Sequence, residues 1–215
     1  MTVAELLKKL GGVSAERVLL DPPPGTATEK DVLAVEQRES KICELIDGVL
    51  VEKAVGFAES VLAVELANLL YPFLIEHDLG ILTGAAGPFR LRRGLVRIPD
   101  VSFISWNQLP NHKVPMKPIP NLYPELAVEV LRRKNTKAEI DRKLHEYFQS
   151  GTRFAWVVDP RKRCVSVYTA PDQSYLLKED QSLDGGDVLP GLNVPLREVF
   201  AQLAEEPARR KRPKG

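Results

Sequence analysis

An acidic residue stands inside one of the most apolar runs of the chain. Residues 126–130 read LAVEV, and Glu129 lies between two valines. An unpaired buried carboxylate is costly, so such residues usually have a cationic or metal partner. Asp100, in the run IPDVSFIS, begins another strand-like segment. Two carboxylates at neighbouring strand ends can share a divalent cation, and oxygen ligands favour Mg²⁺ or Mn²⁺ over zinc. The alternative is an Asp100 that caps a turn and a Glu129 that pairs with an arginine.

Lys143 is the cation best placed to join these carboxylates. It is expected beside the apolar stripe of the helix that follows the Glu129 strand. It can reach Glu129 only if residues 132–135 fold back sharply. A lysine there could orient an attacking water or stabilise the charge that develops during phosphodiester hydrolysis. The alternative is an exposed helical pair between Glu139 and Lys143.

The first half of the chain predicts a hairpin, a long helix and several strands. The run KICELIDGVLVEK is typical of a tight hairpin around Asp47-Gly48 with one buried face. Leucines at helical spacing predict a helix from Glu59 to about His77, which Pro72 should kink or divide and Gly80 should end. Three short strands follow as a meander, within GILTG, PFRLR and VRIPDVSFISW. A proline-rich loop covers residues 107–124.

The second half predicts a strand, a helix and a second hairpin. After the strand at 126–130, a capping box of Thr136 and Glu139 begins a helix that Gly151 ends. RFAWVVD and CVSVYT then form a hairpin, residues 175–177 a short strand, DGGDVLPGL turns, and residues 196–203 a final amphipathic helix. The helix between the strands is suited to a crossover that links parallel strands. The fold class is therefore α/β (α+β), with a mixed sheet flanked by helices.

The termini are expected to differ from the central domain. Residues 1–38 predict an N-terminal appendage of short helices and a proline-rich linker. Residues 39–206 predict the main domain, and residues 207–215 a disordered basic tail.

The composition is that of a globular protein and limits which classes of function the sequence can support. Of the 215 residues, 44% are hydrophobic and 27% charged, as in ordinary globular proteins, and the net charge of +1 provides no global nucleic-acid footprint. Contacts with DNA would have to be local, through arginine and lysine clusters within residues 90–97 and 132–137. The two cysteines exclude a disulfide framework and favour the cytoplasm. No apolar run approaches the length of a membrane span, so no membrane contact is expected.

Several motifs together carry a family resemblance. ELIDG, VRIPDVSFIS, PELAVEVL and KLHEYFQSGTRFAWVVDPRKRCVSVY resemble the Uma-type family of putative endonucleases, a branch of the restriction-endonuclease-like PD-(D/E)XK superfamily. The resemblance covers roughly residues 40–200. It implies a sheet core flanked by helices, a magnesium-dependent nuclease site and frequent homodimers. Asp100 matches the aspartate of the PD element, and Glu129 matches the acidic residue of the (D/E)XK element.

The chain departs from the superfamily pattern in two places and from the usual sequence of family members in a third. Leu131 stands where the superfamily has a lysine, and the family's substitute is the helix lysine, here Lys143. Glu59 stands where many members have a histidine, and the resemblance implies a role as the accessory helix carboxylate. Arg132 and Arg133 replace the Ser-Pro or Ser-Glu that members often have after the strand, which puts the local substrate contacts in question.

The leading hypothesis is a magnesium-dependent DNA endonuclease. In it Asp100 and Glu129 hold Mg²⁺ or Mn²⁺, Lys143 positions or activates the water, and Glu59 assists from outside the metal's coordination. One alternative is a catalytically inactive DNA-binding accessory protein on the same fold. Another is an oligomeric scaffold, which the near-zero net charge permits.

Overall fold

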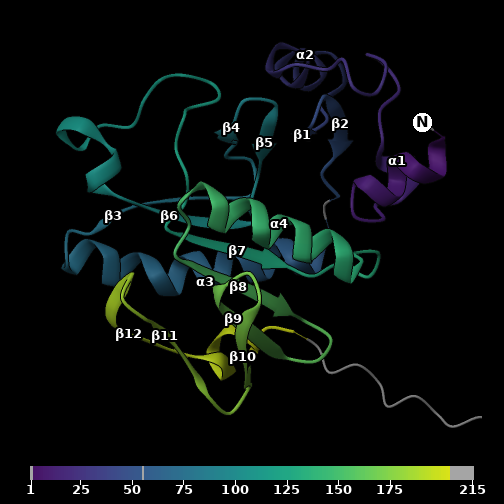
Figure 1. Cartoon of the computed structure of the whole chain (residues 1–215). Helices are drawn as coiled ribbons and strands as arrows, with labels where there is room; N and C mark the ends of the chain where they lie inside the picture. The colour runs from purple at the N-terminus through teal and green to yellow at the C-terminus, as the bar shows by residue number, and fades with distance from the viewer. Residues whose placement is uncertain (1, 55, 204–215) are drawn as a thin grey trace, which may run out of the picture.

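A six-stranded mixed sheet forms the centre of the protein (Figure 1). The computed structural model describes residues 2–54 and 56–203. The strand order is β10–β9–β8–β7–β6–β3. These strands are β3 (Gly80–Thr83), β6 (Val101–Ser105), β7 (Leu126–Val130), β8 (Phe154–Asp159), β9 (Cys164–Ala170) and β10 (Gln173–Lys178). Only β7 and β8 pair in parallel within this described sheet. The mixed sheet with flanking helices confirms the predicted fold class.

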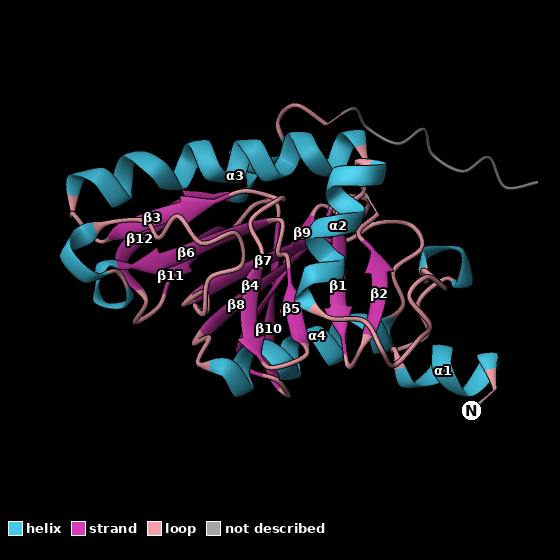
Figure 2. Ribbon diagram, turned by 90° about the horizontal axis from the view of Figure 1, so that it is seen from above, coloured by secondary structure: helices cyan, strands magenta, loops and turns pink. Residues whose placement is uncertain are grey.

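Two helices cover opposite faces of this sheet (Figures 1 and 2). Helix α3 (Phe57–Glu76) packs its buried leucines on a face that includes Val128 and Val130. Helix α4 (Lys137–Ser150) packs on the other face, against β8. Because side chains alternate along a strand, Glu129 points toward α4. The parallel pairing of β7 and β8 around α4 confirms the predicted crossover.

Helix α3 begins two residues before the predicted Glu59 and ends near the predicted His77, but its interior differs from the prediction. It runs through Pro72 as one helix, and it ends at Glu76, while Gly80 begins β3. It is also the one described helix whose length and composition would allow it to cross a membrane, although no such run was expected. Its leucines 62, 66, 70 and 74 are instead buried against the central sheet. Core helices of globular proteins have the same composition.

A second sheet, with the order β2–β1–β5–β4, stands beside the first. Its strands are β1 (Cys43–Ile46), β2 (Val49–Glu52), β4 (Phe89–Arg92) and β5 (Leu95–Arg97). The predicted hairpin is confirmed, but the predicted meander is wrong, because β4 and β5 join this hairpin while β3 pairs with β6. The expectation of one buried face is also wrong, since every residue of β1 is buried.

N-terminal helices explain this double burial. Helix α1 (Val3–Lys9) packs on one side of the second sheet, and helix α2 (Glu29–Glu39) packs on the other. A single 3₁₀ turn, η1 (Ala15–Arg17), lies between them. The proline-rich connection ends earlier than predicted, because α2 begins at Glu29. The domain boundary at residue 38 stays a prediction.

The remaining elements are two 3₁₀ turns, a two-stranded sheet and a short C-terminal helix. The 3₁₀ turns η2 (Trp106–Gln108) and η3 (Pro110–His112) lie in the proline-rich loop. Strands β11 (Ser182–Gly185) and β12 (Leu189–Pro195) form a two-stranded sheet where only turns were predicted. The two strands bury Leu183 and Leu189. Helix α5 (Leu196–Phe200) is shorter than predicted. The predicted tail, residues 207–215, lies outside the described residues.

Candidate active site

Asp100 lies where β6 begins, beside the end of β7. Its backbone N–H donates to Val128 O at 2.9 Å, and its Oδ2 accepts the Val130 N–H at 2.8 Å. The pairing of Val101 with Val128 fixes this position. The two predicted acidic residues therefore come from neighbouring, hydrogen-bonded strands, and both are buried.

Lys143 reaches across from α4 to Glu129. Its Nζ donates to Glu129 Oε1 at 3.0 Å and Oε2 at 2.9 Å, and lies 3.2 Å from Glu44 Oε1. The side chain of Lys143 is only 4% exposed, so solvent does not screen these contacts. The exposed Glu139–Lys143 pair is therefore wrong.

The connection between β7 and α4 makes this reach possible. Asn135 Oδ1 accepts the Arg132 N–H at 2.8 Å, which closes the sharp turn. Thr136 caps α4 by accepting the Glu139 N–H at 3.0 Å. The predicted capping box is only half formed, because the Glu139 carboxylate instead accepts from Arg17 at 2.7 Å and from Asn135 at 2.9 Å.

Lys53 is a buried cation that the sequence analysis missed. Its Nζ lies 3.0 Å from Asp100 Oδ1 and also donates to three backbone carbonyls, those of Ala85 (3.1 Å), Ile98 (2.6 Å) and Pro99 (3.1 Å). A signal was present in the sequence, because Val49, Val51 and Lys53 alternate onto one side of an extended run. That spacing places the lysine in line with two core residues.

A buried ion network extends from Glu129 into the second sheet. Arg97 donates to Glu44 Oε2 at 2.7 Å and to Glu146 Oε2 at 2.6 Å. Tyr147 of α4 donates its O–H to Glu129 Oε1 at 2.6 Å. The network thus links both sheets through α4, and its members fix the orientation of the Glu129 carboxylate.

Arg132 is a second cation on Asp100. Its Nη2 donates to Asp100 Oδ1 at 3.0 Å, and its side chain is 13% exposed, against 2% for that of Lys53. From the sequence, this arginine is expected only in a basic cluster that could contact DNA. The structure places it against the predicted metal ligand.

Burial and charge act in opposite directions on the two acidic groups. Burial raises the pKa of Asp100, but Lys53 and Arg132 outweigh burial and hold that pKa below its ordinary value. Burial raises the pKa of Glu129 above its ordinary value, with the nearby Asp100 and Glu44 adding to the effect and Lys143 opposing it. The carboxylates are therefore inequivalent: Asp100 favours the ionised form more strongly than Glu129 does.

The residues fit a hard divalent cation in donor chemistry. Mg²⁺ is commonly held by one or two carboxylates together with water and substrate phosphate, and Asp100 and Glu129 supply two carboxylates. Both already accept hydrogen bonds from cationic side chains. Within the described residues, no group of three or more His, Cys, Asp or Glu side chains is arranged to hold a metal ion. The two-carboxylate set therefore needs additional oxygen ligands from water or substrate.

Glu59 is not brought into this network. It lies in the first turn of α3, and its carboxylate is folded over the N-cap residue Gly56. No hydrogen bond or ion pair joins it to Asp100, Glu129 or Lys143 in the part of the chain that the structure describes.

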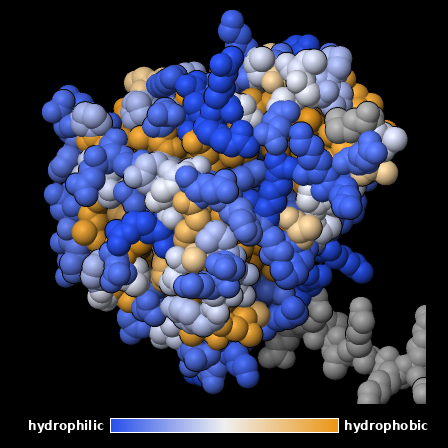
Figure 3. Space-filling view, viewed as in Figure 1, coloured by the Kyte–Doolittle hydropathy of each residue, from blue (hydrophilic) through white to orange (hydrophobic). Residues whose placement is uncertain are grey.

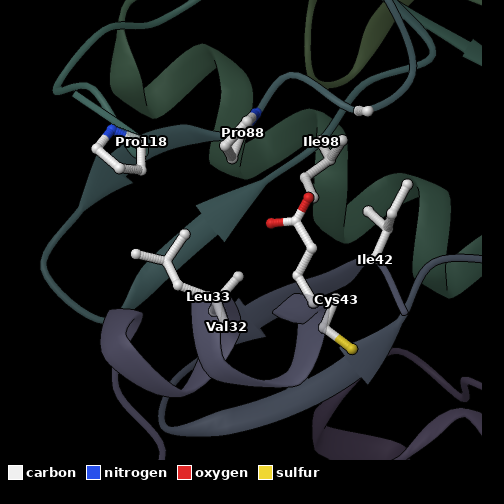
Figure 4. Close-up of a pocket in the computed structure, with 9 residues that line it drawn as sticks. Val32, Leu33, Ile42, Cys43, Pro88, Ile98 and Pro118 are labelled. Carbon is white, nitrogen blue, oxygen red and sulfur yellow. The ribbon is translucent and has the colours of Figure 1, made fainter. Parts of the chain in front are cut away.

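A separate cavity of about 290 Å³ lies between α2 and the second sheet (Figure 4). Val32, Leu33 and Cys43 contribute to its wall. Burial raises the pKa of the Cys43 thiol to about 11, so the thiol stays protonated near neutral pH. A buried, protonated thiol is a packing residue rather than a nucleophile.

Comparison with known proteins identifies the family. The family model for Uma2, described as putative restriction endonuclease, matches residues 29–197. The chain belongs to the Uma2 family. The matched segment includes α2 and every residue of the buried ion network around Glu129.

A solved structure is similar to this Uma2 protein in fold. It is the crystal structure of a putative nuclease belonging to DUF820 from Anabaena variabilis, with a TM-score of 0.65 and 16% identity. The similarity covers 75% of this chain and 91% of the other. No curated protein matches the chain. At this identity the comparison establishes the shared fold, and the family match supports a nuclease.

Proposed function

We propose that this Uma2 protein is a metal-dependent DNA endonuclease that hydrolyses phosphodiester bonds. The observation that carries the proposal is the burial of Lys143 against Glu129, on the strand whose end binds Asp100. Two carboxylates can hold a divalent cation, and a buried lysine beside them can stabilise the charge that develops during metal-assisted hydrolysis. Family membership supports the same chemistry.

Each residue has a distinct role in the proposal. Asp100 and Glu129 would hold Mg²⁺ or Mn²⁺, which when bound supplies Lewis-acid activation of water or of the phosphate. Lys143 is held by Glu129 and Glu44, and it would orient the attacking water or stabilise negative charge on the phosphate. Glu59 stays a proposed accessory carboxylate outside the coordination.

The proposed substrate approach is local rather than global. Hydrophilic residues cover most of the face that carries α4, with apolar areas in separate patches (Figure 3). Exposed Arg133 and Lys134 follow the end of β7, close in sequence to the site. We further propose that the protein acts in the cytoplasm as a homodimer.

A second candidate is a DNA-binding protein without turnover on the same fold. The observation that favours it is the pairing of each central carboxylate with a cationic side chain, which allows the site to be stable as a structural ion network. The third candidate, an oligomeric scaffold, predicts neither DNA binding nor cleavage.

Plasmid nicking distinguishes these candidates. Wild type, Asp100→Asn and Glu129→Gln should be compared in Mg²⁺ and in EDTA, with Asp141→Asn as a surface control on α4. Asp141 pairs with the exposed Lys137, so its loss should leave cleavage intact. We expect nicking by wild type and the control only. Equal cleavage by Asp100→Asn would sink the assignment, and tight DNA binding without nicking in any metal would favour the second candidate.

A further inference from the structure

Asp100 has more cationic partners than its charge requires. Its Oδ1 lies 3.0 Å from Lys53 Nζ and 3.0 Å from Arg132 Nη2, while Oδ2 accepts a backbone N–H. One lysine already balances one carboxylate. Arg132 is therefore not needed to neutralise Asp100, and it occupies an oxygen that a metal ion would use.

The two cations are held very differently. Lys53 is almost fully buried and fixed by three carbonyl acceptors besides Asp100. The Arg132 guanidinium has one hydrogen-bonded contact, to Asp100, and its Nε is buried without a partner among the described residues. Losing one contact frees Arg132, whereas removing Lys53 breaks four. Arg132 is thus the cation that can leave.

The position of Arg132 gives its guanidinium an alternative binding partner. It lies two residues after the end of β7, and the next two residues, Arg133 and Lys134, are exposed. A guanidinium binds phosphate in a bidentate manner, so a phosphodiester at this turn offers Arg132 more than its single contact with Asp100.

We propose that Arg132 is an electrostatic plug on Asp100 that opposes divalent metal binding in the free protein and is withdrawn by a phosphate of bound DNA. The inference rests on the proposed function for the identity of the metal site and of the anion. Lys53 and Arg132 already contact Oδ1, so a metal ion there would be a third cation repelled by both; because Lys53 is held by three carbonyls, the metal competes with Arg132. Because binding free energies are reciprocal, DNA that removes Arg132 raises metal affinity and metal raises DNA affinity by the same factor.

Mn²⁺ binding without DNA tests the plug directly. Free Mn²⁺ would be titrated by electron paramagnetic resonance into wild type, Arg132→Gln and the neighbouring control Arg133→Gln. We expect Arg132→Gln to bind Mn²⁺ at least about tenfold more tightly than wild type. The control should match wild type, and Asp100→Asn combined with Arg132→Gln should lose the gain. Unchanged affinity in Arg132→Gln would overturn the proposal.

Two further arms keep the result interpretable. Arg132→Gln should fold, because Lys53 and the Val130 N–H still bind Asp100, and Arg132→Lys, which retains a cation, should gain less affinity. Equal gains for Lys and Gln would contradict a charge-based plug. Plasmid nicking is measured separately. Tighter Mn²⁺ binding by Arg132→Gln without cleavage by any variant would support the plug and contradict the nuclease function. Cleavage by wild type with unchanged Mn²⁺ affinity in Arg132→Gln would support the nuclease function and contradict the plug.

Discussion

Replacing Lys143 with methionine removes the buried cation of the site while keeping the length and apolar stem of the side chain. The ammonium contacts both oxygens of Glu129 and one oxygen of Glu44. Glu44 keeps Arg97, but Glu129 loses its only cationic contact within hydrogen-bonding distance among the described residues. The charge left on Glu129 therefore determines the cost of the substitution.

Protonation limits this cost. The ordinary pKa of the carboxyl is 4.5, and burial already raises it in the native protein. Without Lys143 the native carboxyl can escape its buried charge by taking up a proton. At about 1.4 kcal/mol per pH unit, holding that proton at pH 7 costs about 3 kcal/mol relative to the unfolded chain. We expect Lys143→Met to lower the free energy of unfolding by about 3 kcal/mol at pH 7.

The same reasoning fixes the direction of the pH dependence. A raised native pKa means that the folded protein holds this proton where the unfolded chain has lost it. Stability of the variant should fall as the pH rises from 5 to 7, because the unfolded state binds fewer protons. The difference from wild type should consequently be smaller at pH 5 than at pH 7.

Urea unfolding at several pH values measures these effects. Lys137→Met is the matched control on the same helix, because the Lys137 side chain is 87% exposed in its pair with Asp141 and should contribute less than about 1 kcal/mol. Glu129→Gln in the Lys143→Met background should recover stability, since it removes the unpaired charge. A pH-independent loss, or no recovery in the double variant, would refute the reasoning.

Two other predictions concern acid sensitivity and the N-terminal segment. The pKa of Asp100 is held below its ordinary value of 3.8, so the ionised carboxylate stabilises the fold above about pH 4, and this contribution is lost as the pH falls further. The free energy of unfolding of Asp100→Asn should therefore fall less steeply than that of wild type between pH 5 and pH 3. An equally steep fall, measured by urea unfolding, would contradict the ion pairing. Gly11 has a φ of +83°, and a Cβ there would lie 2.9 Å from Ala138 O in α4. Gly11→Ala should therefore lower the midpoint of thermal unfolding more than Gly94→Ala, a positive-φ glycine with open space around it, whose change should cost only about 1–2 kcal/mol; equal losses would mean that the contact with α4 is unimportant.

Local patterns predicted the elements better than their partners. The Asp47-Gly48 turn and the run LAVEV each have a signal within a few residues, and both appear as expected. The distribution of the middle strands over two sheets has no such signal, because β5 pairs with β1, far away in sequence. At Pro72 a local signal gave the wrong prediction. Proline usually interrupts a helix, but packing of α3 on the sheet keeps this helix continuous.

The residues of the candidate site likewise fall into those with a local sequence signal and those whose partners are distant in sequence. Glu129 and Asp100 could be selected because a carboxylate in an apolar run is unusual in itself. Lys53 and Arg97 could not be assigned partners, because their acceptors come from other strands and from α4. Arg132 was predicted only as part of a basic cluster that could contact DNA, because the turn held by Asn135 that directs it to Asp100 has no signal in the sequence.

The N-terminal segment also bears on the chemistry, although the sequence analysis treated it as an appendage. Arg17 donates to Glu139 at the beginning of α4 and to the backbone of Glu52, one residue before Lys53. Thr136, the cap of α4, donates its hydroxyl to Gly11 O at 2.6 Å. The segment therefore holds together the two elements that carry Lys143 and Lys53. Because these lysines contact Glu129 and Asp100 respectively, the segment from Gly11 to Arg17 helps to set the spacing of the two carboxylates.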